Sequence, residues 1–557
     1  MTRDEAIPKP GTGGEADEAR SCGRWAAAVI LAAASIVFVA GATSDVVKGD
    51  EAYYYMFADA WFHQGVLHRP VYNPIYESAE AGYYYTTEPL WPLLVSLVWH
   101  VTGVHAWSAQ ALQAGFYALL LAAVYVLGRD LLGPRGALAA LLAAVSVPMA
   151  AAFSVLFYTD VPAAALVAAT ALLLLRKQYL AAGVMIGLAY LMKRNTAFLT
   201  PAFAVWAFWT AGPIWRRALR VAELAIPAAL VTLPDWVWRW THLPAYYEPV
   251  SIPYIRTRLG TFFAKQALVT TASGEGESAA TLVQRLWARL FSSAEASRVS
   301  NPADMLHYLG ALVPGLLALY LLRRAWDRRD VRPWLAVGAC VVFSLAMFTL
   351  NMEVRYTMPA VPLAAVIVAR GLRGWCQKPW VLALVGLAAF GHLGATAWHV
   401  GAQRTLTAGQ QALFAYLRSE TPPHARILYP GEVLTSQTRR QAVWSQLKNP
   451  ATGASRITLF LCQTDPGLML EWLRANEVDY ICIDERRVYA ERGEVVGFGY
   501  PRSFVERLRT LPFLEEVKGE WPGMELWRVK EESLGEAPAP PERPSPSPAQ
   551  ASGGEKG

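Results

Sequence analysis

Apolar residues dominate this chain in runs of about 20, the length that an α-helix needs to cross the hydrocarbon core of a bilayer. The runs begin near residue 25 and continue to about residue 400, with short polar loops between most of them. This pattern predicts about eleven membrane-spanning helices. We place them at residues 25–43, 106–127, 136–154, 161–175, 179–192, 197–212, 219–238, 307–322, 333–350, 358–372 and 380–399.

Residues 44–105 interrupt the pattern between the first and the second run. They are rich in Tyr, Trp, His and Pro and do not form one simple span. Within them, "EPLWPLLVSLVWHVTG" (88–103) is apolar but too short to cross a bilayer. It is typical of a helix that lies along or dips into the membrane interface.

Arginine and lysine gather in every second loop, which the positive-inside rule assigns to the cytoplasm. These loops contain Arg129, Arg135, Arg176, Lys177, Arg216, Arg217, Arg220, Arg323, Arg324, Arg328, Arg329, Arg332, Arg373 and Lys378. The N-terminal tail, 1–24, is then cytoplasmic as well. The extracytoplasmic side receives 44–105, 155–160, 193–196, 239–306, 351–357 and the chain after residue 400.

The composition of residues 401–532 is that of a soluble domain. "ITLFLC" (457–462) and "YICIDE" (480–485) are typical of strands, and "PGLMLEWLRANEV" (466–478) between them has helical spacing. We therefore predict a small extracytoplasmic α/β domain with some parallel pairing. Cys462 and Cys482 form either a disulfide or two buried free thiols. The tail 533–557 is rich in Pro and Ser, which predicts disorder.

The composition supports a polytopic α-helical membrane protein. Of the 557 residues, 54% are hydrophobic and only 17% are charged, which is too apolar for a soluble protein of this size. The net charge of +6 does not indicate nucleic-acid binding, because the basic residues lie largely in short loops. The five cysteines show no metal-ligand spacing.

Charged residues converge on the predicted outer face, at the ends of the spans. The carboxylates are Asp50, Glu51, Glu88 and Asp160, and the cations are Lys193, Arg194 and Arg355. Because the positive-inside rule disfavours exposed outer cations, this set indicates a charged cavity. A purely structural network of salt bridges is the alternative.

The chemistry of this set suits a lipid-linked phosphate. Arginine offers a bidentate fork and lysine a point charge to phosphate oxygens. A carboxylate that faces water can take the proton of an acceptor hydroxyl. If phosphate is the leaving group, it departs as a stable anion, so one base and cationic stabilisation suffice.

Five segments occur in an order that resembles the membrane-embedded GT-C glycosyltransferases. They are "GDEAYYYMFADAWFHQG", "TTEPLWPLLVSLVWHVTG", "FYTDVPAAALVAATALLLL", "GLAYLMKRNTAFLTP" and "EVRYTMPAVPLAA". The sequence is most similar to the protein O-mannosyltransferase and aminoarabinose-transferase branch, over roughly residues 25–400. "YTD" and "KRNT" also resemble dolichol-pathway glucosyltransferases, so the sugar stays open.

The resemblance implies a polyprenyl-phosphate-linked sugar as donor and Asp50 as the catalytic base. It implies that Lys193 and Arg355 contact the donor phosphate and that Asp160 has a supporting role. Glu88 stands in a T-E-P step where that branch commonly has K-P or E-x-P, so the usual lysine is absent. Neighbouring residues complete the expected substrate-binding set, namely Glu51, Arg194 and Tyr356. Glu51 either orients an acceptor or faces solvent.

The expected activity is inverting transfer of the sugar to an extracytoplasmic protein, lipid or glycan. We expect the protein in a bacterial plasma membrane, with the active site and the C-terminal domain facing outside. No cofactor is required by this reading, although the carboxylates leave room for a divalent metal. A transporter of lipid-linked saccharide is one alternative. Such proteins often show inverted repeats, whereas this sequence shows no internal repeat and its charges lie at the outer face. A non-catalytic envelope assembly protein is the other.

Overall fold

The computed structural model describes residues 13–44, 50–65, 88–209, 212–242, 358–431, 433–443, 460–489 and 499–530. Their contacts divide the chain between Thr405 and Leu406 into two units, which are described separately below. The predicted spans 307–322 and 333–350 and the candidate residues Arg355 and Tyr356 lie outside the described residues.

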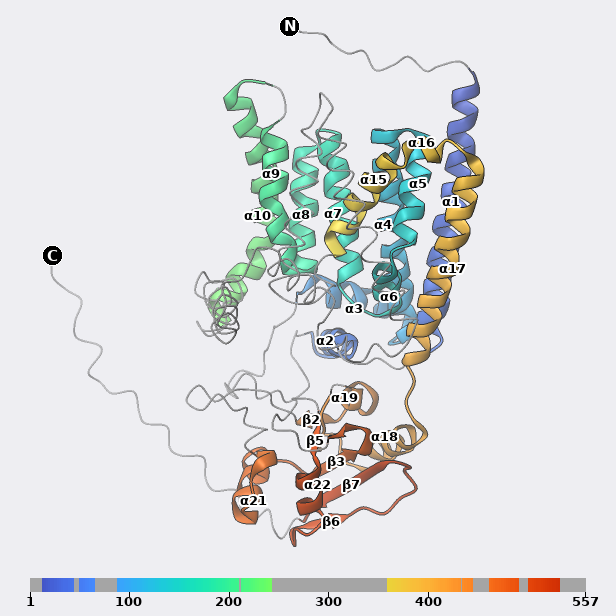
Figure 1. The fold of residues 1–557 in the computed structure, drawn as a ribbon. Helices are drawn as coiled ribbons and strands as arrows, with labels where there is room; N and C mark the ends of the chain where they lie inside the picture. The colour runs from blue at the N-terminus through green and yellow to red at the C-terminus, as the bar shows by residue number, and fades with distance from the viewer. Residues whose placement is uncertain are drawn as a thin grey trace, which may run out of the picture. The chain divides into compact units, whose positions relative to one another are not determined.

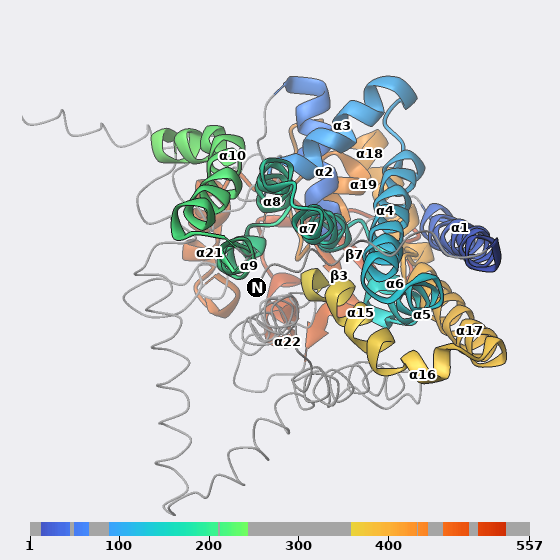
Figure 2. The same cartoon turned by 90° about the horizontal axis from the view of Figure 1, so that it is seen from above.

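The first unit is a bundle of helices (Figure 1). Its helices are α1 (Gly13–Ala42), α2 (Asp50–Gln64), α3 (Leu90–Thr102), α4 (Ala106–Leu132), α5 (Pro134–Val145), α6 (Pro148–Val155), α7 (Asp160–Leu175), α8 (Tyr179–Met192), η1 (Arg194–Leu199), α9 (Thr200–Phe208), α10 (Ile214–His242), α15 (Val361–Gly371), α16 (Arg373–Cys376) and α17 (Pro379–Gln403). The long helices run side by side, whereas α2 and α3 lie across one end of the bundle, as Figures 1 and 2 both show.

Every predicted span within the described residues coincides with helical structure. Four of the described helices are long and apolar enough to cross a membrane, and α5 with α6 makes a fifth if that bent pair is one span. Four shorter apolar helices accompany them. The total of eleven spans stays a prediction. The orientation of α3 agrees with the interfacial helix expected from its length.

The predicted span 136–154 is the one that departs most from a straight helix. The structure divides it into α5 and α6, whose axes differ by 62°. Val147 has an extended backbone between them, which is the conformation that a following proline, here Pro148, imposes on its neighbour. The bend carries the chain across the end of the bundle where α2 and α3 also lie (Figure 1).

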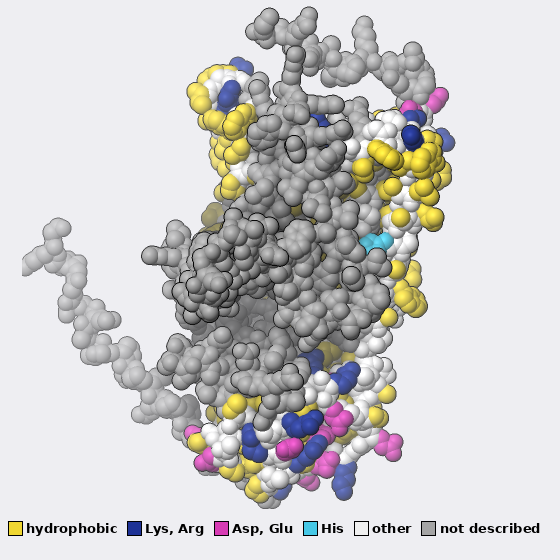
Figure 3. Space-filling model, viewed as in Figure 1, with side chains coloured by type: hydrophobic (Ala, Val, Ile, Leu, Met, Phe, Trp, Pro, Cys, Tyr) yellow, Lys and Arg dark blue, Asp and Glu magenta, His cyan; other side chains and the backbone are white. Residues whose placement is uncertain are grey.

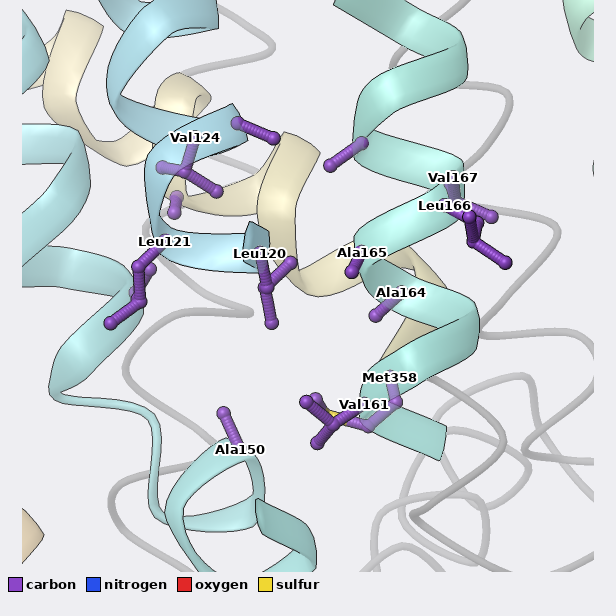
Figure 4. Packing of buried hydrophobic residues seen from close by; sticks show 14 of the residues in the cluster. Leu120, Leu121, Val124, Ala150, Val161, Ala164, Ala165, Leu166, Val167 and Met358 are labelled. Atoms are coloured by element: carbon purple, nitrogen blue, oxygen red, sulfur yellow. The ribbon is translucent and has the colours of Figure 1, made fainter. Parts of the chain in front are cut away.

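Small side chains allow the central helices to approach one another closely. Figure 4 shows Leu120 of α4 on the side of that helix nearer the alanine-rich α7. Alanines of α7 such as Ala164 and Ala165 are fully buried. Close backbone approach of this kind is a main source of helix association in membranes. Met358, which precedes α15, is also fully buried and lies beside Val161 of α7 (Figure 4).

Large hydrophobic side chains remain exposed on the outside of the bundle. They include Trp215, Ile226, Leu230 and Trp236 of α10, Trp380, Leu384, Leu387 and Trp398 of α17, and Trp25, Leu31 and Val39 of α1. Figure 3 shows hydrophobic side chains gathered over α10 on one side and over α1 and α17 on the other. Such surfaces are expected where lipid is the solvent.

The second unit is a small α/β domain. Its elements are α18 (Ala408–Glu420), β1 (Arg426–Leu428), α19 (Val433–Thr438), β2 (Gln441–Val443), α21 (Pro466–Ala475), β3 (Tyr480–Asp484), η5 (Glu485–Arg487), β4 (Val488–Tyr489), β5 (Tyr500–Pro501), α22 (Arg502–Leu508), β6 (Leu514–Glu516) and β7 (Met524–Val529). The main sheet has the order β2-β1-β3-β7-β6. β1 pairs in parallel with β2 and β3, while β7 is antiparallel to β3 and β6.

This domain confirms the predicted α/β character, the strand at 480–484 and the helix that begins at Pro466. The strand predicted at 457–462 is wrong for its described part, because residues 460–462 are helical. Short apolar runs do not distinguish a strand from a buried helical turn.

Both domain cysteines are free thiols, Cys462 exposed and Cys482 buried. The disulfide is therefore wrong, and so is the burial of Cys462. Burial raises the pKa of Cys482 well above its usual range.

Candidate functional site

Charged residues separate to the two ends of the helical unit. At one end, Arg135 forms an ion pair with Glu18 at 2.9 Å and donates to the carbonyl oxygen of Gln377 at 3.2 Å. Arg176 pairs there with Asp130 at 3.0 Å. We call this the basic end. Loops that the sequence assigns to one face thus contact one another, while the side of the membrane that they face stays a prediction.

The opposite end, which we call the site end, contains a buried ion pair between Asp160 and Lys193. Asp160 begins α7, where the helix dipole favours a negative charge. Lys193 follows the last residue of α8 in an extended conformation. Asp160 is fully buried and Lys193 is 5% exposed. Within the part of the chain that the structure describes, Oδ2 of Asp160 accepts no hydrogen bond.

Helix α2 is fixed to the segment that leads into Asp160. The backbone N–H of Phe157 donates to Oε1 of Glu51 over 2.6 Å. One turn further along α2, the hydroxyl of Tyr54 lies 3.3 Å from that of Thr159, and the rings of Tyr54 and Tyr158 contact edge to face. These contacts hold the first turn of α2 against the chain just before the Asp160–Lys193 pair.

Asp50 is the first residue of α2. The structure therefore places its backbone in that fixed turn, next to Glu51. Its side chain lies outside what the structure describes, so the role of its carboxylate stays a prediction.

Glu51 does not face solvent. Its residue is only 1% exposed, and its Oε2 lies 3.4 Å from Nε of Arg404. The solvent-facing alternative for Glu51 is therefore wrong. Arg404, which sequence reasoning missed, is itself 4% exposed and follows the end of α17.

Glu88, which lies just before α3, is hydrogen-bonded to the residue that follows Lys193. Its Oε1 accepts a hydrogen bond from the backbone N–H of Arg194 over 3.1 Å, and Arg194 directly follows Lys193. α3 is in turn packed on α2 through Trp99, whose ring contacts that of Tyr55 at a centroid distance of 4.9 Å. Both crosswise helices thus meet the ends of α7 and α8 at the site end.

The structure brings five of the candidate residues to the site end, namely Glu51, Glu88, Asp160, Lys193 and Arg194. Their pairing was not predicted, because sequence shows only that they share a face. Among the described residues, no group of three or more His, Cys, Asp or Glu side chains could hold a metal ion.

Comparison with known proteins identifies the fold. Residues 87–238 match the family model described as dolichyl-phosphate-mannose-protein mannosyltransferase. The crystal structure of ArnT from Cupriavidus metallidurans in the apo state superposes with a TM-score of 0.60 at 14% identity, covering 91% of this chain and 98% of that one. The chain has the GT-C fold. The resemblance seen in its sequence is thereby confirmed.

Two similar structures contain lipid phosphates. ArnT from Cupriavidus metallidurans bound to undecaprenyl phosphate has a TM-score of 0.59 at 14% identity, covering 93% of this chain and 99% of that chain. The archaeal oligosaccharyltransferase AglB from Archaeoglobus fulgidus, in complex with an inhibitory peptide and a dolichol-phosphate, has a TM-score of 0.52 at 14% identity. The superposition covers 83% of this chain and 69% of the AglB chain. No curated protein matches this chain.

Proposed function

We propose that this chain is a glycosyltransferase that moves a sugar from a polyprenyl-phosphate-linked donor to an extracytoplasmic acceptor. The observation that carries the proposal is the buried Asp160–Lys193 pair at the site end of a GT-C fold. Similar structures contain undecaprenyl phosphate and dolichol-phosphate, and these ligands support a lipid-linked donor here.

Lys193 binds the donor phosphate in this proposal. An ammonium group has three donors, so its bond to Asp160 is compatible with a phosphate oxygen as a further acceptor. Asp160 holds the lysine charged and oriented in its buried position, because a buried cation without a counter-ion is costly. Being fully buried, Asp160 suits this supporting role better than contact with a water-borne acceptor.

Arg355 is the second proposed phosphate ligand. It lies three residues before Met358, which packs beside Val161, the neighbour of Asp160 in α7 (Figure 4). Three residues span at most about 10 Å of extended chain, so the proposal requires only a short path from a described contact. Tyr356 and Arg194 are proposed to line the same donor site.

Asp50 is the proposed general base. Its carboxylate takes the proton of the acceptor hydroxyl while the oxygen attacks the anomeric carbon. The bond from that carbon to the phosphate oxygen breaks, and polyprenyl phosphate leaves as an anion, so the anomeric configuration inverts. We place this chemistry on the extracytoplasmic side of a bacterial plasma membrane, where both substrates are accessible.

Three outcomes of one assay distinguish the candidate functions. The purified chain is incubated with a panel of polyprenyl-phosphate sugars and envelope material as acceptor. Release of polyprenyl phosphate with a labelled product supports the transferase. Movement of intact donor across vesicle membranes without product would indicate a transporter. If neither product release nor movement of donor is observed, the result would favour an assembly protein. Mass spectrometry of envelope glycans and glycoproteins from a deletion strain then identifies the acceptor.

A further inference from the structure

Arg404 joins four segments of the helical unit that are far apart in sequence. Its Nη1 donates to the carbonyl oxygen of Gly41 at 2.5 Å and lies 3.5 Å from that of Val155. Its own carbonyl oxygen accepts a hydrogen bond from the hydroxyl of Ser44. Its Nε lies 3.4 Å from the carboxylate of Glu51. The ends of α1, α6 and α17 therefore meet the first turn of α2 at this one side chain.

The ion pair between Glu51 and Arg404 is buried, so both charges are removed from water. Glu51 is 1% exposed and Arg404 is 4% exposed, so neither charge is solvated by bulk water. Removing one partner of a buried ion pair leaves an uncompensated charge, whereas replacing both can be neutral. A buried ion pair is thus weak evidence for stability, and in some proteins such a pair instead selects one conformation.

We propose that Arg404 is a positioning residue that, through Glu51, holds the first turn of α2 and with it the carboxylate of Asp50. This inference rests on the proposed function, because it assigns Asp50 the work of the base. The guanidinium group of Arg404 donates hydrogen bonds to backbone carbonyl oxygens at the ends of α1 and α6 and forms an ion pair with Glu51. Glu51 passes the constraint on to the N–H of Phe157, three residues before Asp160.

The arrangement fixes the base relative to the donor site. Asp50 and Glu51 are adjacent in the first turn of α2. Oε1 of Glu51 accepts the hydrogen bond from Phe157, and its Oε2 forms the ion pair with Arg404. Misplacement of a catalytic group by about 1 Å can reduce the rate by about 100-fold. Loosening this turn should therefore lower turnover without weakening the grip of Lys193 on the donor.

The test measures turnover and donor affinity separately in Arg404→Gln, Glu51→Gln and the double variant. We expect kcat to fall about 10- to 100-fold in each single variant, while the Kd for donor stays within about twofold of wild type. Because both residues act through one contact, the double variant should be no slower than the slower single variant. The control is Arg135→Gln, which removes an arginine from an ion pair at the basic end and should leave kcat unchanged.

Folding is checked with two further variants. The double variant leaves no buried unpaired charge, so it should fold even where a single variant fails. Arg404→Lys keeps the charge but loses the guanidinium fork, and it should recover turnover only in part. Wild-type kcat in a folded Arg404→Gln protein, strictly additive effects in the double variant, or equal losses in affinity and turnover would overturn the proposal. So would failure of all these variants to fold, because Arg404 would then be needed for folding itself.

Amide hydrogen exchange separates this inference from the proposed function. In Arg404→Gln, exchange should accelerate in residues 51–56 and 157–159 but not in α4 or α8. If the wild-type protein transfers no sugar but Arg404→Gln still shows this local change, the transferase is refuted, while the role of Arg404 in holding α2 stands. Unchanged exchange at α2 would refute that role whatever the activity.

Discussion

A lysine and an aspartate that are both buried at the site end raise the question of whether they serve folding or binding. Replacing only Lys193 with methionine should lower the free energy of unfolding by about 3–5 kcal/mol, because the carboxylate of Asp160 then loses its counter-ion. The double variant Asp160→Asn/Lys193→Met should recover much of that stability. Thermal unfolding in detergent measures both.

Donor binding should not recover with stability. The double variant lacks the ammonium group of Lys193 as a phosphate ligand, so its affinity for undecaprenyl phosphate should stay reduced by the equivalent of about 1.5–3 kcal/mol. Restored affinity in the double variant would show that Lys193 serves the fold and not the phosphate.

A single substitution also tests Asp50 as the proposed general base. Asp50→Asn keeps the shape and hydrogen bonding of the side chain but cannot accept a proton, so turnover should fall about 100- to 10,000-fold. Donor affinity should be unchanged. Asp59→Asn is the matched control, since Asp59 lies on the same helix and pairs with His63 at 3.4 Å. Near-normal turnover in a folded Asp50→Asn enzyme would remove this base from the mechanism, and Glu88 would be tested next.

Two thiols in the second unit give a prediction about pH. Burial raises the pKa of Cys482, so the folded state favours the protonated thiol. The stabilisation is therefore full below the pKa of the unfolded thiol, about 8.5, and is lost as pH rises beyond it. Native labelling, followed by peptide mass spectrometry, should modify the exposed Cys462 quickly and leave Cys482 unmodified through pH 9. Equal labelling would contradict its burial.

Sequence reasoning at this scale finds the participants better than their partners. Asp160 and Lys193 were noticed because charges at span ends are costly and both fell on one predicted face. Arg404 was missed because it follows a span like an ordinary interfacial arginine, and its partner Glu51 lies 353 positions earlier (404 − 51). No local pattern carries a contact of that separation.

At the scale of elements, α8 and α10 pack closely because α8 carries the motif Gly183-x-x-x-Gly187. A Cβ built on Gly183 would overlap the backbone oxygen of Leu224, and one on Gly187 would lie 2.9 Å from Cβ of Val231. Small residues spaced by four allow such approach in membranes. Gly183→Ala should therefore lower the free energy of unfolding by about 1–3 kcal/mol.

The matched control is Gly115→Ala on α4, where an added Cβ meets nothing within 4 Å. It should be neutral or stabilise by up to about 1 kcal/mol, because alanine favours helix more than glycine does. Thermal unfolding of the two variants under the same conditions decides the matter. A Gly183→Ala protein as stable as wild type would mean that α8 and α10 separate easily.

Helices with long apolar runs were predicted well, since length and hydropathy are local properties. The aromatic helix α2 was not predicted as a helix, because "DEAYYYMFADAWFHQ" has no clear apolar stripe. The break at Val147 was readable in principle from Pro148, but the surrounding alanines masked it as one continuous span. The apolar run 457–462 predicts a strand, but its described residues 460–462 are helical, because so short a run does not distinguish the two.

At the scale of the whole molecule, the two ends of the helical unit imply a testable topology. α17 has 25 residues, which gives a length of about 38 Å and exceeds a hydrocarbon core of about 30 Å. We therefore predict that α17 crosses the membrane and that its two ends lie on opposite sides. The basic end, with Arg135 and Arg176, should face the cytoplasm by the positive-inside rule, and the site end with Asp160 should face outward.

Paired fusions of a reporter that is active only in the cytoplasm test this orientation. Fusion after Gln377, just before α17, should give strong activity, and fusion after Gln403, at its other end, should be silent. The pair differs by one helix, so expression level and earlier insertion are matched. Activity in the reverse order would place the Asp160–Lys193 pair and Asp50 in the cytoplasm. The acceptor would then be a cytoplasmic molecule, and the proposed envelope reaction would be wrong even if the chain transfers sugar.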